Sequence, residues 1–99
     1  MISSHFQPCQ IRNDLEYFED KLNRYLPFFK SLSRIRQLAL IEVCSYVGFK
    51  NFLSFTKLIK AVQRHDYISA KKAMCENKWS YQYGMRFQEL GDILVTNQI

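Results

Sequence analysis

One segment of the chain, residues 38–47, is apolar at nearly every position, with Glu42 and Ser45 as the exceptions. Ser33 before it is a residue type that caps helix N-termini, and Gly48 after it is typical of a helix end. A helix that is apolar on most sides is normally surrounded by other helices. We therefore expect a central core helix here. A buried strand is the alternative, which the length of the segment and its boundaries disfavour.

The residues before this segment predict one amphipathic helix. Asn13 and Glu16 have the spacing of a capping box, so the helix is expected to begin at Asn13. Pro27 should end or kink it within the two preceding residues. The apolar stripe of this helix consists of Leu15, Phe18, Leu22, Tyr25, Leu26 and Phe29.

Further helices are expected after Gly48. Asn51 and Asp66 are candidate N-caps, and Asn77 marks the end of the helix that Asp66 begins. A short segment around residues 79–83 precedes Gly84 and a final helix, in which Gly91 should weaken the helix or permit a close contact. The expected inward-facing residues are Phe52, Phe55, Leu58, Ile59, Val62, Tyr67, Ala70, Ala73, Met74, Met85, Leu90, Ile93 and Leu94.

The composition agrees with a helical domain. Three glycines and two prolines in 99 residues leave few turns, and 47% hydrophobic residues suit one core that needs no disulfides. We expect an all-α fold: an N-terminal arm over residues 1–12 and a single compact domain over residues 13–99. This domain should contain five to seven helices around the central helix.

Cysteine and histidine usage gives no sign of a metal or cofactor site. Cys9, Cys44 and Cys75 are widely spaced and include no CxxC pair, so we expect no zinc, redox centre or other cofactor. His5, Cys9 and His65 supply too few ligands in one place for a metal site. The free cysteines, together with the lack of a signal sequence or spanning segment, predict a cytoplasmic protein with no membrane partner.

The chain has a net charge of +5, which suits an acidic partner. Lys57, Lys60 and Arg64 recur at helical spacing and should share one face, with Lys71 and Lys72 in the next segment. A solvated helix face is the default interpretation, and phosphate contact is the functional one. No nucleic-acid recognition motif accompanies these residues, so nucleic-acid binding ranks below the other functions.

The carboxylates before the central helix do not suggest catalysis. Glu16, Glu19 and Asp20 lie within two turns of one helix, so they cannot stand on opposite sides of a substrate. We expect a solvated face, with Asp20 and Arg24 as an i,i+4 pair.

A dense cluster of aromatic and polar residues lies near the C-terminus. Aromatic and arginine side chains are frequent anchors of interfaces, because they bury much area at a small entropic cost. The alternative is that the tryptophan packs into the core and the tyrosines cover neighbouring helices. The cluster consists of Trp79, Tyr81, Gln82, Tyr83 and Arg86.

From about residue 32 to residue 94 the chain resembles the C-terminal lobe of the T-even phage lysozymes. The resemblance is weaker over residues 13–31 and absent over residues 1–12. It rests on the combined spacing of three blocks: Arg36-Gln-Leu-Ala-Leu-Ile41 with Gly48, then Phe55-Thr56, then Trp79, Gln82 and Arg86.

The resemblance implies a helical lobe that forms one wall of a glycan cleft. In these enzymes the other wall is a mostly β lobe with a catalytic glutamate close to the N-terminus. No Glu-Gly start precedes Asp14 here, so we expect no catalytic residues and no enzymatic activity. Arg86 matches the arginine that pairs with the catalytic glutamate, and we expect it to be free for another partner or to support only its own helix. Tyr46 replaces a cleft-facing glutamine, which suggests a rebuilt wall.

The expected function is therefore that of a non-catalytic, phage-lysozyme-derived protein that binds another protein, for instance an inhibitor of a host defence or cell-wall enzyme. The expected contact residues are Tyr46 and the C-terminal cluster. A peptidoglycan-binding module and one half of a split muramidase, completed by a second chain, are the alternatives. Self-association into a homodimer would also cover an apolar wall left exposed.

Overall fold

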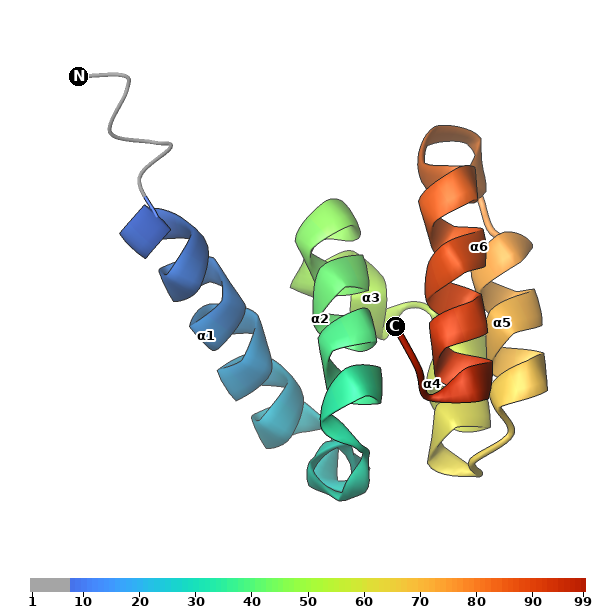
Figure 1. Cartoon of the computed structure of the whole chain (residues 1–99), viewed down its shortest axis with the longest axis horizontal. Helices are drawn as coiled ribbons and strands as arrows, with labels where there is room; N and C mark the ends of the chain where they lie inside the picture. The colour runs from blue at the N-terminus through green and yellow to red at the C-terminus, as the bar shows by residue number, and fades with distance from the viewer. Residues whose placement is uncertain (1–7) are drawn as a thin grey trace.

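The structure is a computed structural model that describes the backbone of residues 8–99 and the side chains of residues 15–99. This part of the chain is all-helical and contains no strand, as expected. Its elements are α1 (Pro8–Tyr25), the 3-10 helix η2 (Pro27–Ser31), α2 (Arg34–Val47), α3 (Phe49–Leu53), α4 (Thr56–Gln63), α5 (Tyr67–Cys75) and α6 (Ser80–Thr96) (Figure 1). None of these helices has an apolar stretch long enough to cross a bilayer.

Helix α2 is the central helix that the sequence predicts. It lies between α1 on one side and α6 on the other (Figure 1). The Ser33 hydroxyl accepts a hydrogen bond from the backbone N–H of Arg36, and Gly48 ends the helix with a φ of 88°. The buried residues of α2 are Ala39, Leu40, Ile41, Val43, Cys44 and Val47. Burial raises the pKa of the Cys44 thiol to about 12, which makes it an unreactive core residue.

The first helix differs from the expectation at its N-terminus and in the width of its apolar stripe. Helix α1 begins at Pro8, so Asn13 lies inside it and is not its N-cap. The apolar stripe is narrower than predicted, because Leu15 and Tyr25 are 43% and 54% exposed. Pro27 ends α1 as expected and begins the 3-10 helix, whose Phe29 is fully buried.

The helix expected from Asn51 onward is two short helices, α3 and α4. Asn51 is inside α3, where its side-chain amide donates to the carbonyl oxygen of Val47 at 2.8 Å, so the N-cap assignment is wrong. Asp66 does cap α5, accepting the backbone N–H of Ser69 at 3.1 Å. Asn77 follows α5 and donates to carbonyl oxygens of its last turn, which confirms it as the end signal.

The expected short segment before Gly84 is the first turn of α6, which starts at Ser80, and a kink at Tyr83 sets this turn apart from the rest of the helix. Tyr83 alone has non-helical angles within it, with a φ of −118°. Met85 is 84% exposed, so the prediction that it faces inward is wrong, whereas Leu90 and Leu94 are buried as expected.

Gly91 lies where α5 and α6 approach each other closely. It is buried, and a Cβ atom there would lie 2.5 Å from Cγ and 3.3 Å from Cα of Lys71. Lys71 also forms an ion pair with Asp92 at 2.5 Å across the same two helices. The glycine therefore permits a close helix contact, one of the two roles expected for it.

Replacing Gly91 with alanine should lower the free energy of unfolding by up to about 2 kcal/mol, because a steric cost of about 1–3 kcal/mol opposes a gain of about 1 kcal/mol in helix propensity. Urea unfolding followed by circular dichroism measures this. Gly84→Ala is the matched control: nothing lies within 4 Å of its Cβ position, so stability should stay equal or rise. A more stable Gly91→Ala protein would contradict the close contact.

Candidate functional site

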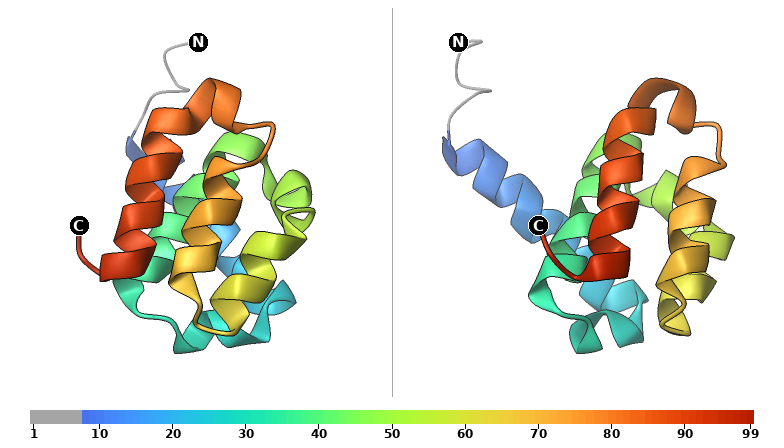
Figure 2. Two further views of the ribbon diagram at one scale, coloured as in Figure 1. Left: turned by 90° about the vertical axis from the view of Figure 1, so that its right-hand side faces the viewer. Right: turned by 45° about the vertical axis from the view of Figure 1, so that its right-hand side comes forward.

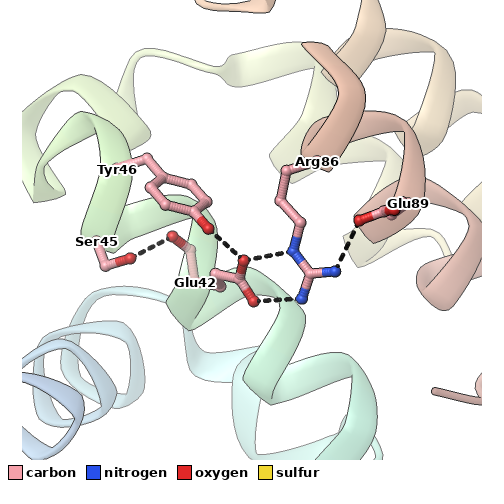
Figure 3. A network of polar contacts seen from close by, with 5 residues as sticks. All are labelled: Glu42, Ser45, Tyr46, Arg86 and Glu89. Carbon is pink, nitrogen blue, oxygen red and sulfur yellow. Dashed lines mark hydrogen bonds and ion pairs between the residues drawn. The ribbon is translucent and has the colours of Figure 1, made fainter. Parts of the chain in front are cut away.

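Four side chains from α2 and α6 meet in one polar network. Arg86 on α6 donates to both carboxylate oxygens of Glu42 on α2, from Nε at 2.6 Å and from Nη2 at 2.8 Å. The Tyr46 hydroxyl donates to the same Glu42 carboxylate at 2.5 Å. A third nitrogen of Arg86 donates to Glu89 at 3.0 Å (Figure 3). The guanidinium fork thus joins α2 to α6 in the bidentate geometry that gives the strongest ion pairs.

Helical spacing places each member of the network. Glu42 and Tyr46 are four residues apart on α2, and Arg86 and Glu89 are three apart on α6, so each pair shares one helix face. The rings of Tyr46 and Tyr83 stack at 4.8 Å, and the Tyr83 hydroxyl donates to the Tyr46 carbonyl oxygen at 3.3 Å. These contacts fix the side chain of Tyr46, whose hydroxyl donates to Glu42 and orients it.

The network holds Glu42 in its ionised form. Hydrogen bonding to Arg86 lowers the pKa of Glu42 below its ordinary value, with partial burial acting in the opposite direction. Hydrogen bonds to Glu42 and Glu89 raise the pKa of Arg86, and the bond to Glu42 raises the pKa of Tyr46. Glu42 is therefore an acceptor at neutral pH and has no proton to donate.

The expectation that Arg86 is free is therefore wrong. Glu42 of the same domain satisfies it, 44 positions earlier in the chain. Glu42 was not predicted as a site residue, although it is one of two interruptions in the apolar segment 38–47. A charged residue in such a segment requires a partner, and this was the available signal.

A groove runs along the junction of α2 and α6 from this network. It is lined mainly by aliphatic side chains, and Glu42 and Arg86 belong to its wall: the full lining is Ile35, Leu38, Ala39, Glu42, Arg86, Leu90, Ile93 and Ile99. A second depression continues from it past Glu89, Asp92 and Thr96. We call the first depression the α2–α6 groove. It combines an apolar floor with a charged edge.

The structure divides the aromatic cluster predicted near the C-terminus. Tyr83 and Arg86 join Tyr46 in the network, as described. Trp79 is half-buried and packs against the core, with Lys78 Nζ 5.4 Å from its ring. Tyr81 is 98% exposed, and Gln82 is also exposed. These five residues of the C-terminal cluster thus do not form one continuous patch.

The predicted basic face is also only partly assembled. Lys57, Lys60, Arg64 and Lys72 line one depression between α4 and α5. Lys71 points to the opposite side of α5, where it pairs with Asp92, so its assignment to this face is wrong.

The remaining polar residues have structural roles. Asp20 and Arg24 form the expected pair at 3.2 Å, and Glu19 pairs with Arg34 at 2.9 Å between α1 and α2. Within the described residues no three His, Cys, Asp or Glu side chains gather as metal ligands. His5 and the Cys9 side chain, named above as potential ligands, lie outside the described residues.

A double-mutant cycle should measure the coupling across the network. Glu42→Gln and Arg86→Gln should each lower the free energy of unfolding, with a coupling of about 1 kcal/mol, above the median for exposed pairs because the geometry is bidentate and partly buried. Glu89→Gln is the control, since this carboxylate is more exposed and should change stability by less than about 0.5 kcal/mol. Additive effects of the two main substitutions would contradict the pair.

The contribution of Glu42 should depend on pH. Its pKa is lowered in the folded state, so the stability it contributes is present above its unfolded pKa of about 4.3 and is lost as pH falls through the folded pKa. The difference in unfolding free energy between the wild type and Glu42→Gln should therefore shrink between about pH 5 and pH 2. Denaturant titrations across this range test it, and a constant difference would contradict the pairing.

Comparison with known proteins gives one distant similarity. Over 71 residues the chain is 25% identical to probable T4-type lysozyme 1 of Dictyostelium discoideum, which covers 72% of this chain and 42% of that protein. The chain thus spans less than half the length of this relative. No family model and no solved structure matches this chain. At this level of identity the chain is lysozyme-like in sequence. The part of it that the structure describes is all-α in fold.

Proposed function

We propose that this chain is a non-catalytic, lysozyme-derived domain that binds another protein through the α2–α6 groove. The observation that carries the proposal is the Glu42–Arg86 pair. In the phage lysozymes that the chain resembles, the matching arginine pairs with the catalytic glutamate of a second lobe. Here a carboxylate of the same domain takes that place, so the arginine needs no second lobe to be satisfied.

The chemistry of the groove argues against glycoside hydrolysis. The reaction needs a protonated carboxylic acid, kept so by a raised pKa, and a second carboxylate across the sugar. Glu42 is the carboxylate in the wall of the groove, and its pKa is shifted in the opposite direction by Arg86. It can accept hydrogen bonds but cannot protonate a leaving group.

The lining favours a protein over a sugar as the occupant. Most side chains of the groove are aliphatic, and aliphatic surface with a charged edge is typical of protein interfaces. Sugar binding relies on exposed ring faces and many polar groups. The rings of Tyr46 and Tyr83 stack on each other, so each already has one face covered. The specific form that we expect is inhibition of a host defence or cell-wall enzyme in the cytoplasm of a phage-infected cell.

A peptidoglycan-binding module, or one half of a split muramidase, is the second candidate. The similarity to a T4-type lysozyme favours it. It differs from the first candidate in its ligand, which is insoluble cell wall or a second chain that supplies a catalytic glutamate.

Replacing a groove residue with a charged one should separate these functions. We expect the wild-type chain to retain one protein in stoichiometric amount from a host lysate, and Leu38→Glu to lose it, because a carboxylate on the aliphatic floor must be desolvated on binding. Ile68→Glu is the matched control: Ile68 is 75% exposed on α5 and lines no part of this groove. Thermal unfolding should verify that both variants fold.

Two outcomes would overturn the proposal. One is co-sedimentation of the chain with purified peptidoglycan together with a lack of any retained protein. The other is release of soluble glycan from peptidoglycan by the chain, alone or with a second polypeptide.

A further inference from the structure

A second surface, separate from the α2–α6 groove, carries most of its charge in one sign. It is the depression between α4 and α5. Helix α5 lies between α4 and α6 (Figure 2, left). The lining of the depression consists of Lys57, Lys60, Ala61, Arg64, Ser69, Lys72, Ala73 and Glu76. We call this depression the α4–α5 groove. It continues past Lys57 into another depression that reaches Phe55 and Asn77.

The cations of this groove are largely uncompensated. Arg64 has a long contact of 3.8 Å with Asp66, and Glu76 is the one carboxylate in the lining. Among the side chains of residues 15–99, no carboxylate lies within ion-pair distance of Lys57, Lys60 or Lys72. By contrast, Lys71, one residue before Lys72, forms an ion pair with Asp92 on α6. Four positive charges against one negative charge thus face a single depression.

We propose that the α4–α5 groove binds a linear phosphate-bearing polymer through the charges of its backbone. Lys57 and Arg64 are seven residues apart, which spreads the cations over about 10 Å of helix. A single phosphate cannot contact all of them, and one exposed contact contributes little. A chain of phosphates contacts several cations at once and releases its counterions, which makes multiple weak contacts add up to binding.

The α4–α5 groove is suited to bind the charged backbone of such a polymer and not its bases. Its floor between the lysines is made of small side chains, Ala61, Ser69 and Ala73, with no aromatic ring on which a base could stack. Binding should therefore be independent of sequence and strongly dependent on salt. Because these residues do not line the α2–α6 groove, the inference can hold or fail independently of the proposed function.

A salt titration with two probes tests the inference. Fluorescence anisotropy should detect binding of a labelled thymidine oligonucleotide at low ionic strength, and unlabelled inorganic polyphosphate should displace it. Lys60→Gln/Lys72→Gln should weaken binding at least tenfold. It should also reduce the slope of log affinity against log salt concentration by about 1.4, since each lost phosphate contact in a single strand removes about 0.7.

The matched control is Lys30→Gln/Lys50→Gln, which gives the same net charge but changes exposed lysines that line neither groove. At about 0.1 M salt, where the Debye length is about 10 Å, it should leave binding within about twofold of the wild type, because charge at a greater distance is largely screened. Equal weakening by both double variants would mean that binding depends on net charge and not on the α4–α5 groove, and this would overturn the inference. Absence of oligonucleotide binding at low salt would also overturn it, as would binding only to anionic lipid vesicles. Failure of polyphosphate to compete would exclude backbone-only recognition.

Discussion

The ion pair between Glu42 and Arg86 is the constraint on which the arrangement of α2 and α6 depends. A charge within the mostly apolar segment 38–47 is costly where it is buried unless another group pairs with it, because desolvation opposes the ionised form. Arg86 meets this requirement with two nitrogen donors, and Tyr46 supplies a further hydrogen bond. The polar network thus fixes how the facing sides of α2 and α6 lie against each other. The aliphatic residues around the network supply most of the apolar burial.

The domain has two outer surfaces of different chemistry. The α2–α6 groove is aliphatic, and its charges are already paired or lie at its edge. The α4–α5 groove is lined by cations with few partners. Helix α5 separates the two, with Lys71 turned toward α6 and Lys72 toward α4. A domain of this size can therefore present an apolar face and a charged face without either disturbing the other.

Local signals predicted the helices well where a cap residue determines the boundary. Ser33, Gly48 and Asp66 act where the sequence places them, because a cap needs only its own side chain or φ angle and the adjacent backbone. Asn51 failed as a cap because its amide donates back to Val47. It lies inside the short helix α3, which ends at Leu53. Propensity cannot distinguish one helix from two short ones when packing decides the break.

The all-α class and the central helix follow from the amino-acid sequence alone, because a long apolar segment between a cap and a glycine leaves few other folds. The amino-acid sequence also singled out Arg86, Tyr46 and Tyr83 as candidate contact residues. Only the tertiary structure decided that Arg86 meets Glu42, and that Tyr81 stays in solvent while Tyr83 stacks on Tyr46. The physical reason is that spacing along the chain specifies which residues share a helix face, whereas contacts between helices depend on how those faces pack.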